Sequence, residues 1–141
     1  MATPARAFSL ASRAPPKSVI RLSFAWPGVV RVVICCWVRV VSEPLSDYSR
    51  FSLAQVPLNA KAGEDIRYLP RPRAVELSLP DEDFWLFDSC RAAVFHYGPD
   101  GGVARRELLT DPAAIVQRCY WRDAGWHYAD GWEEFAARHG G

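Results

Sequence analysis

Acidic side chains gather at two places in the sequence where they could carry chemistry. Glu64 and Asp65 lie in a polar turn, and Asp83 and Asp88 bracket a segment of aromatic and aliphatic residues. Two carboxylates held close together can share a proton in acid–base catalysis or bind a divalent cation. These four residues are therefore the candidates for a carboxylate cluster.

A small enzyme or ligand-binding protein could use this cluster together with Arg67 and Tyr68, which follow its first pair. In the simpler interpretation the acids are solvated turn residues, or Glu64 or Asp65 caps a helix or pairs with Arg67 or Arg71. The sequence contains no nucleophile motif and no phosphate-binding loop. It therefore indicates no catalytic residue.

Cysteines and histidines lack the spacing of a metal site. The four cysteines form no Cys-x-x-Cys pair, and the three histidines are too far apart to form a His-x-x-x-His pair. We expect no metal and no cofactor, and histidines at the surface or at helix ends. Free, mostly buried thiols are typical of a reducing cytoplasm, where we expect the protein to reside.

Tryptophans and arginines alternate near the C-terminus, from Trp121 through Arg122 to Trp126. Aromatic rings beside arginines can stack on nucleic acid. However, residues 43–141 carry eleven basic and sixteen acidic side chains, a net charge of −5, whereas a phosphate-binding surface is normally basic. We expect no nucleic-acid binding, and we interpret the helix aromatics as core residues whose Trp and Tyr tips reach the surface. If Trp121, Trp126 and Trp132 instead share an exposed face, that face would bind a protein partner.

The interaction or ligand candidates are acidic, aromatic and arginine side chains of these motifs and of a predicted helix after Pro44. They are Asp47, Tyr48, Arg50, Glu64, Asp65, Arg67, Asp83, Trp85, Asp88, Trp121, Arg122, Asp123 and Trp126. No membrane segment is expected. The apolar run over residues 29–41 contains two arginines and is shorter than the about 20 apolar residues that a spanning helix needs.

Three short runs in the middle of the chain have the composition of consecutive β-strands. Residues 83–88, 92–97 and 103–109 are separated by turn sequences, as in an antiparallel meander. The first run is apolar on both faces, which predicts a place at the sheet centre. The β-branched residues of segment 31–41 predict a fourth strand.

Asp111 and Pro112 predict a helix start, because aspartate caps helices and proline is favoured in the first turn. The helix is expected over residues 112–128. Weaker helical patterns cover residues 45–55, 73–79 and 130–138. We expect the first of these to end before Pro57, and a strand over residues 48–56 is an alternative to it.

The sequence therefore predicts an α+β domain in residues 29–141, with an antiparallel meander sheet of about four strands packed by the C-terminal helix. Residues 1–28 mix Ala, Ser, Pro and Arg without a sustained period, and are expected to form a disordered N-terminal tail. Residues 1–42 contain six basic and no acidic side chains, so the two parts of the chain carry +6 and −5. This basic start could be a targeting peptide, but the apolar run begins late and lacks a cleavage site.

Four ordered blocks of the sequence resemble a known family. They include Ser-Asp-Tyr-Ser-Arg-Phe within residues 38–51, Gly-Glu-Asp-Ile-Arg-Tyr-Leu-Pro-Arg within 62–71, Leu-Pro-Asp-Glu-Asp-Phe-Trp-Leu-Phe-Asp at 79–88, and Asp-Pro followed by Tyr-Trp-Arg-Asp-Ala-Gly-Trp within 111–126. In this order they resemble the actinobacterial family called domain of unknown function 6879, over residues 38–128. Members are often encoded near helix-turn-helix regulators, so the resemblance implies a regulatory or partner-binding role.

Residues 1–37 do not resemble the longer acidic and aromatic N-terminal region of that family. Together with the charge split, this suggests a shifted reading frame or a wrongly placed start for the N-terminal third. We therefore predict a non-catalytic regulatory or protein-interaction module of a bacterial cytoplasm, with a helix-turn-helix regulator as one partner to test. The alternative is the small enzyme or ligand-binding protein that uses the carboxylate cluster.

Overall fold

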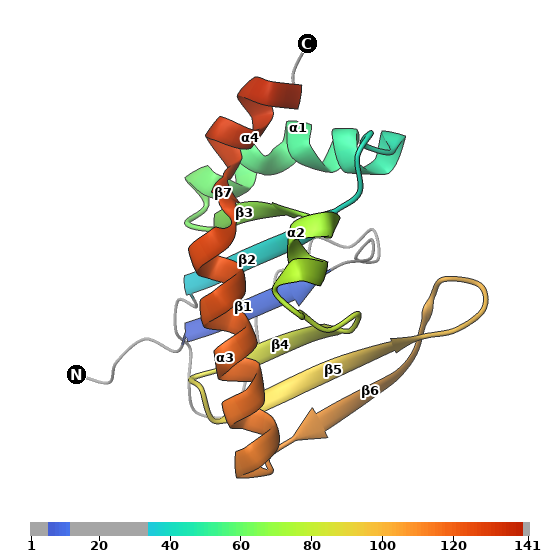
Figure 1. Ribbon diagram of the computed structural model, residues 1–141, viewed down its shortest axis with the longest axis vertical. Coiled ribbons are helices and arrows are strands. Elements are labelled where there is room, and N and C mark those ends of the chain that lie inside the picture. Colours follow the sequence, from blue (N-terminus) through green and yellow to red (C-terminus); the bar gives the residue numbers. More distant parts are fainter. Residues whose placement is uncertain (1–5, 12–33, 140–141) are drawn as a thin grey trace.

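Seven strands form one mixed sheet in the computed structural model, which describes residues 6–11 and 34–139 (Figure 1). The strand order across the sheet is β6-β5-β4-β1-β2-β3-β7. The strands are β1 (Arg6–Ala11), β2 (Ile34–Val41), β3 (Asp65–Pro70), β4 (Asp83–Phe87), β5 (Arg91–Tyr97), β6 (Val103–Leu109) and β7 (Asp130–Gly131). The expected meander is present as β4, β5 and β6, which pair antiparallel in sequence order.

The predicted four-stranded antiparallel sheet is wrong, because β1, β2 and β3 pair parallel to one another. β1 lies in the region that we expected to be a disordered tail, yet it pairs with both β2 and β4. Phe8 and Leu10 of β1 are 5% and 1% exposed. The remaining residues of that tail, and the predicted domain boundary at residue 28, lie outside the described residues.

Four helices pack against the sheet: α1 (Asp47–Lys61), α2 (Arg71–Glu76), α3 (Pro112–Tyr128) and α4 (Trp132–His139). The prediction for α3 is confirmed, and the Asp111 carboxylate accepts a hydrogen bond from the Ala114 amide at 3.0 Å, as an N-cap does. α1 does not end before Pro57 but continues to Lys61. In the described parts of the chain, no helix is long and apolar enough to cross a membrane.

Each face of the sheet carries its own hydrophobic core. We call the first the α3-side core, in which Phe8, Val38 and Phe84 pack under α3, which runs across the strands in Figure 1. The second, the α1-side core, contains Trp37 and Tyr68 together with residues of α1 and α4. Because strand side chains alternate between faces, β4 supplies both cores, as its apolar sequence predicted.

The buried position of β1 leads to a stability prediction. We expect Leu10→Ala to lower the free energy of unfolding by about 2–5 kcal/mol, because truncating a buried leucine leaves a cavity. Leu108→Ala, at a side chain that is 67% exposed, should change it by less than about 0.5 kcal/mol. Urea unfolding of both variants measures the difference, and equal values would contradict the placement of β1 in the core.

Candidate functional site

The predicted carboxylate cluster does not assemble. Glu64 and Asp65 stand at the start of β3, whereas Asp83 begins β4 and Asp88 follows its end. Strands β1 and β2 lie between β3 and β4, and the length of β4 separates Asp83 from Asp88. In the described part of the chain, no group of three or more His, Cys, Asp or Glu side chains is placed to hold a metal ion.

Asp83 has a structural environment of its own. The residue is 4% exposed, and the Tyr97 hydroxyl donates a hydrogen bond to its carboxylate at 2.7 Å. A buried carboxylate is stable only with such partners. Asp83 therefore ties the start of β4 to the end of β5.

The three tryptophans form no shared exposed face, and those of α3 pack as the core residues that the sequence favoured. Trp121 and Trp126 pack against the α3-side core, where their rings lie 6.1 Å from Phe84 and 6.4 Å from Phe8. Trp132 packs instead against the α1-side core. The three tryptophans therefore share no exposed surface, and they stabilise the packing of the helices.

Two predicted arginines hold α3 in place. The Arg67 guanidinium lies 3.8 Å from the centre of the Trp126 ring and donates a hydrogen bond to the Trp126 carbonyl at 3.1 Å, which joins β3 to α3. Arg122 donates hydrogen bonds to the Ser89 hydroxyl and to the Asp123 carboxylate. Trp85 is 5% exposed, and its ring stands edge-on to that of Trp37 at 4.8 Å.

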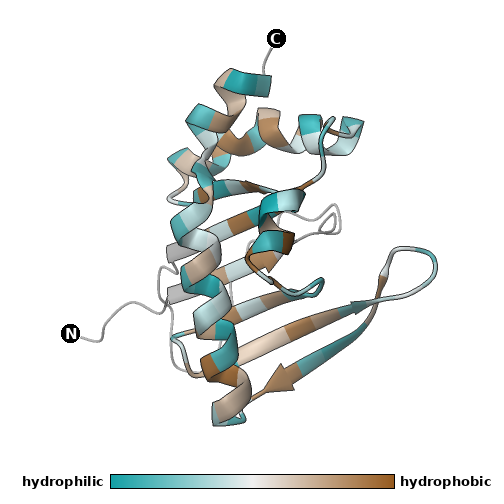
Figure 2. Cartoon of the chain, viewed as in Figure 1, coloured by the Kyte–Doolittle hydropathy of each residue, from teal (hydrophilic) through white to brown (hydrophobic). Residues whose placement is uncertain are grey.

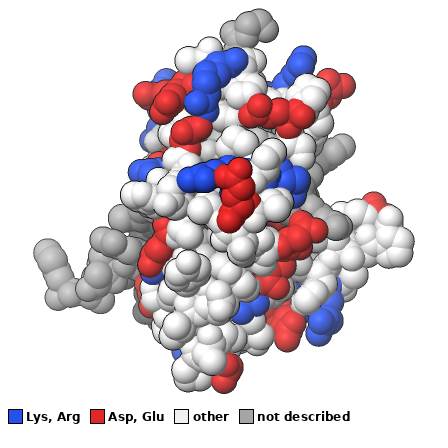
Figure 3. Space-filling model, in the orientation of Figure 1, with Lys and Arg blue, Asp and Glu red and all other residues white. Residues whose placement is uncertain are grey.

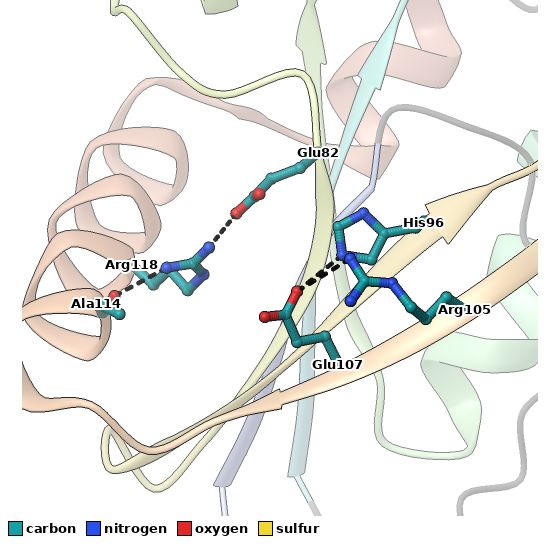
Figure 4. Close-up of polar contacts among 6 residues, drawn as sticks. All are labelled: Glu82, His96, Arg105, Glu107, Ala114 and Arg118. Atoms are coloured by element: carbon teal, nitrogen blue, oxygen red, sulfur yellow. Dashed lines mark hydrogen bonds and ion pairs between the residues drawn. The ribbon is translucent and has the colours of Figure 1, made fainter.

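A charged cluster that sequence reasoning missed lies between α3 and the meander (Figure 4). Arg118, which is 9% exposed, donates one hydrogen bond to the Glu82 carboxylate at 2.6 Å and one to the Ala114 carbonyl at 3.1 Å. On neighbouring strands, His96 Nε2 lies 3.0 Å from the Glu107 carboxylate. Arg105 lies 3.6 Å from the same carboxylate oxygen.

A histidine beside a carboxylate can serve in acid–base chemistry. Here the His96 and Glu107 side chains are each 40% exposed, and Glu107 is shared with Arg105. This is the arrangement of a surface polar contact between adjacent strands, with Arg105 as the cationic partner of Glu107. The cluster therefore fastens the β5–β6 hairpin, and the Arg118–Glu82 pair fastens α3 to the start of β4.

A row of unpartnered polar atoms crosses the opposite face of the sheet. Among the described residues, the buried atoms Ser9 Oγ, Trp37 Nε1 and Arg39 Nε have no hydrogen-bond partner, and Tyr68 Oη lies near Ser52 without meeting hydrogen-bond geometry. Ser9 faces Trp37 across β1 and β2, and Arg39 faces Tyr68 across β2 and β3. This part of the sheet is therefore rich in donors, unlike the acidic cluster that the sequence predicted.

Burial also perturbs the pKa of Tyr68, a member of this row, and that of Glu64 at the start of β3. It raises the pKa of the Tyr68 hydroxyl, and Arg39 opposes that shift only in part. Burial likewise raises the pKa of the Glu64 carboxyl, which Arg39 lowers by less. The folded chain consequently favours the protonated form of Glu64 more than the unfolded chain does.

α1 presents an apolar stripe to solvent, and its apolar residues are visible as brown segments in Figure 2. Tyr48, Phe51 and Leu58 are 37%, 62% and 68% exposed, and Ala54 between them is exposed as well. Residues three and four positions apart lie on the same side of a helix, so these four side chains form one continuous line. We call this line the α1 outer stripe.

The family model described as domain of unknown function (DUF6879) matches residues 33–137. The chain belongs to the DUF6879 family. The predicted resemblance is thus confirmed and extends beyond residues 38–128. No curated protein and no solved structure matches the chain.

The DUF6879 match contains every strand of the sheet except β1. β1 nevertheless lies between β4 and β2, in the middle of the sheet. The α1 outer stripe, the Arg118–Glu82 pair and the donor residues of β2 and β3 all lie within the match. Ser9 is the member of the donor row that the family region does not supply.

The Arg118–Glu82 pair should respond unequally to removal of its two charges. The Arg118 side chain is 11% exposed and the Glu82 side chain 29%. We expect Glu82→Gln to lower the free energy of unfolding by about 3 kcal/mol, because it leaves a buried cation unpaired. Arg118→Met should lower it by only about 1–2 kcal/mol, because water can solvate Glu82. Chemical denaturation measures both, and a larger loss for Arg118→Met would contradict this ranking.

The raised pKa of Glu64 leads to a pH-dependent prediction. At pH 7 the ionised carboxylate costs stability, and this cost disappears as the pH falls through the folded pKa towards the unfolded value of 4.5. We expect Glu64→Gln to stabilise the fold at pH 7 and to lose that advantage below pH 4.5. Thermal unfolding at several pH values tests this, with exposed Glu133→Gln as the control. A gain that persists unchanged in acid would contradict it.

Proposed function

We propose that this DUF6879 chain is a non-catalytic protein-interaction domain that acts in regulation in a bacterial cytoplasm. It binds its partner through the α1 outer stripe. The observation that carries the proposal is the exposure of Phe51 and Leu58 on a helix whose other side is already buried. Contiguous apolar side chains that are exposed to solvent favour a role in binding another molecule.

α1 has two apolar sides with different environments. Leu53 and Val56 are buried in the α1-side core, so the packing of α1 on the sheet is complete without the outer stripe. Asp47 and Arg50, two of the predicted interaction residues, are exposed in the first turn beside Tyr48. An apolar centre with charged residues at its rim is the composition of a protein–protein interface.

The charge distribution supports a protein partner over nucleic acid. On the face drawn in Figure 3, basic and acidic side chains are interspersed, without a continuous basic surface. Because the family resemblance associates such chains with helix-turn-helix regulators, a regulator of that type is the first partner to test. The competing enzyme hypothesis needs Glu64, Asp65, Asp83 and Asp88 together, and the sheet topology keeps them apart.

Co-purification from the native cytoplasm tests the proposal. The tagged chain is compared with a Phe51→Ser/Leu58→Ser variant, and captured proteins are identified by mass spectrometry and then rebound in purified form. We expect a specific protein to be retained by the original chain and lost from the variant. Affinity should fall by at least about tenfold, because apolar anchors dominate interface energies.

A matched control separates loss of binding from loss of structure. Val75→Ser alters a residue on α2 that is 71% exposed, and it should leave partner binding unchanged. Both variants should unfold within about 0.5 kcal/mol of the original chain, because they alter exposed side chains. A partner that binds the double variant as tightly as the original chain would contradict the role of the α1 outer stripe.

A further inference from the structure

β6 is the outermost strand of the meander and pairs with β5 alone among the described strands (Figure 1). The other end of the sheet is formed by β7, which has only two residues. An edge strand presents backbone N–H and C=O groups that can pair with another strand. With seven residues, β6 is long enough to offer a substantial pairing edge.

The sequence of β6, Val-Ala-Arg-Arg-Glu-Leu-Leu, has opposite charges on one face. Arg105 and Glu107 lie on the same face as His96, whereas Arg106 and Leu108 lie on the other. Leu108 is 67% exposed, although it is an apolar residue in a strand. The strand therefore combines an apolar residue without cover and a pair of opposite charges two positions apart.

We propose that β6 pairs antiparallel with β6 of a second copy of this chain, about a two-fold axis at Arg106. Directly opposed residues of a sheet point to the same face, so the axis of such a pairing must pass beside a residue rather than between two. With the axis at Arg106, Arg105 opposes Glu107 of the partner, and Glu107 opposes the partner's Arg105. Ala104 then opposes Leu108, so apolar residues also meet on both sides of the axis.

Neighbouring registers are less favourable. An axis at Arg105 places two copies of Arg105 together and leaves Glu107 without an opposing arginine. An axis at Glu107 places two copies of Glu107 together and sets Arg106 against Leu108. Since like charges directly opposite destabilise a sheet and opposite charges stabilise it, the register at Arg106 is selected.

Two features oppose the pairing. The register at Arg106 brings two copies of Arg106 face to face, and a register irregularity near Ala104 bends the end of β6. Against one like-charge pair stand two Arg105–Glu107 pairs and two Ala104–Leu108 pairs, so the balance favours association. The regular segment from Arg105 to Leu109 carries the charged pairs, which makes a weak, concentration-dependent dimer the expected state.

Sedimentation of charge variants tests this proposal. The original chain should dimerise as its concentration rises, whereas Arg105→Glu and Glu107→Arg should each associate at least about tenfold more weakly, because both create like-charge pairs across the axis. An equimolar mixture of these two variants restores opposite charges at both sites. It should therefore form a heterodimer that neither variant forms with itself.

Leu108→Lys provides a second test that spares the ion pairs within the monomer. It should weaken the dimer, whereas Val75→Lys, which introduces the same charge at an exposed residue of α2, should not. Phe51→Ser/Leu58→Ser should also leave the dimer intact, so that failure here and failure of the proposed function are distinguishable. A chain that stays monomeric at every concentration, or a dimer that survives Leu108→Lys or the charge changes, would overturn the proposal.

Discussion

The backbone pairing of β1 on both of its edges is the interaction on which the rest of the sheet depends. β1 is parallel to β2 and antiparallel to β4, and it joins the β2-β3-β7 group to the β4-β5-β6 meander. Its side chains serve both faces: Phe8 and Leu10 enter the α3-side core, and Ser9 lies on the other side with Trp37 and Trp85. One short strand therefore holds two groups of strands and two cores in register.

Three arginine side chains hold α3 against the rest of the chain. Arg67 stacks on Trp126, Arg73 lies 4.6 Å from the Tyr128 ring, and Arg118 pairs with Glu82. Each joins α3 to a different part of the chain. A planar guanidinium can stack and donate hydrogen bonds at once, so these residues can be enclosed without losing all their partners.

Local sequence signals predicted the elements that local chemistry determines. Asp111 and Pro112 identified the start of α3, and the turns between aromatic runs identified β4, β5 and β6. β1 could not be identified in the same way, because Arg-Ala-Phe-Ser-Leu-Ala contains no β-branched residue and becomes a strand by pairing with β2 and β4. α1 continues past Pro57 because Leu53 and Val56 pack in the α1-side core. The sequence around Pro57 does not indicate this tertiary contact.

The candidate site was harder to predict than the fold, because it depends on which way each side chain faces. Arg118 is buried, and its carboxylate partner Glu82 lies 36 residues away in the sequence. The sequence near α3 therefore does not indicate that the two residues form an ion pair. The sequence favoured the helix tryptophans as core residues, and Trp121 and Trp126 do pack against the α3-side core. Asp47, Tyr48 and Arg50 were predicted as interaction residues and are exposed, whereas the exposed neighbours Phe51 and Leu58 were not among the predicted residues.

The position of β1 has a consequence for any fragment limited to the family region. Residues 33–137 alone would contain two strands, β2 and β4, whose facing edges are separated by the width of one missing strand. Such a fragment would bind an extended peptide between these edges. The peptide would pair parallel with β2 and antiparallel with β4. A separate peptide with the sequence of β1 would then bind the fragment and complete its sheet.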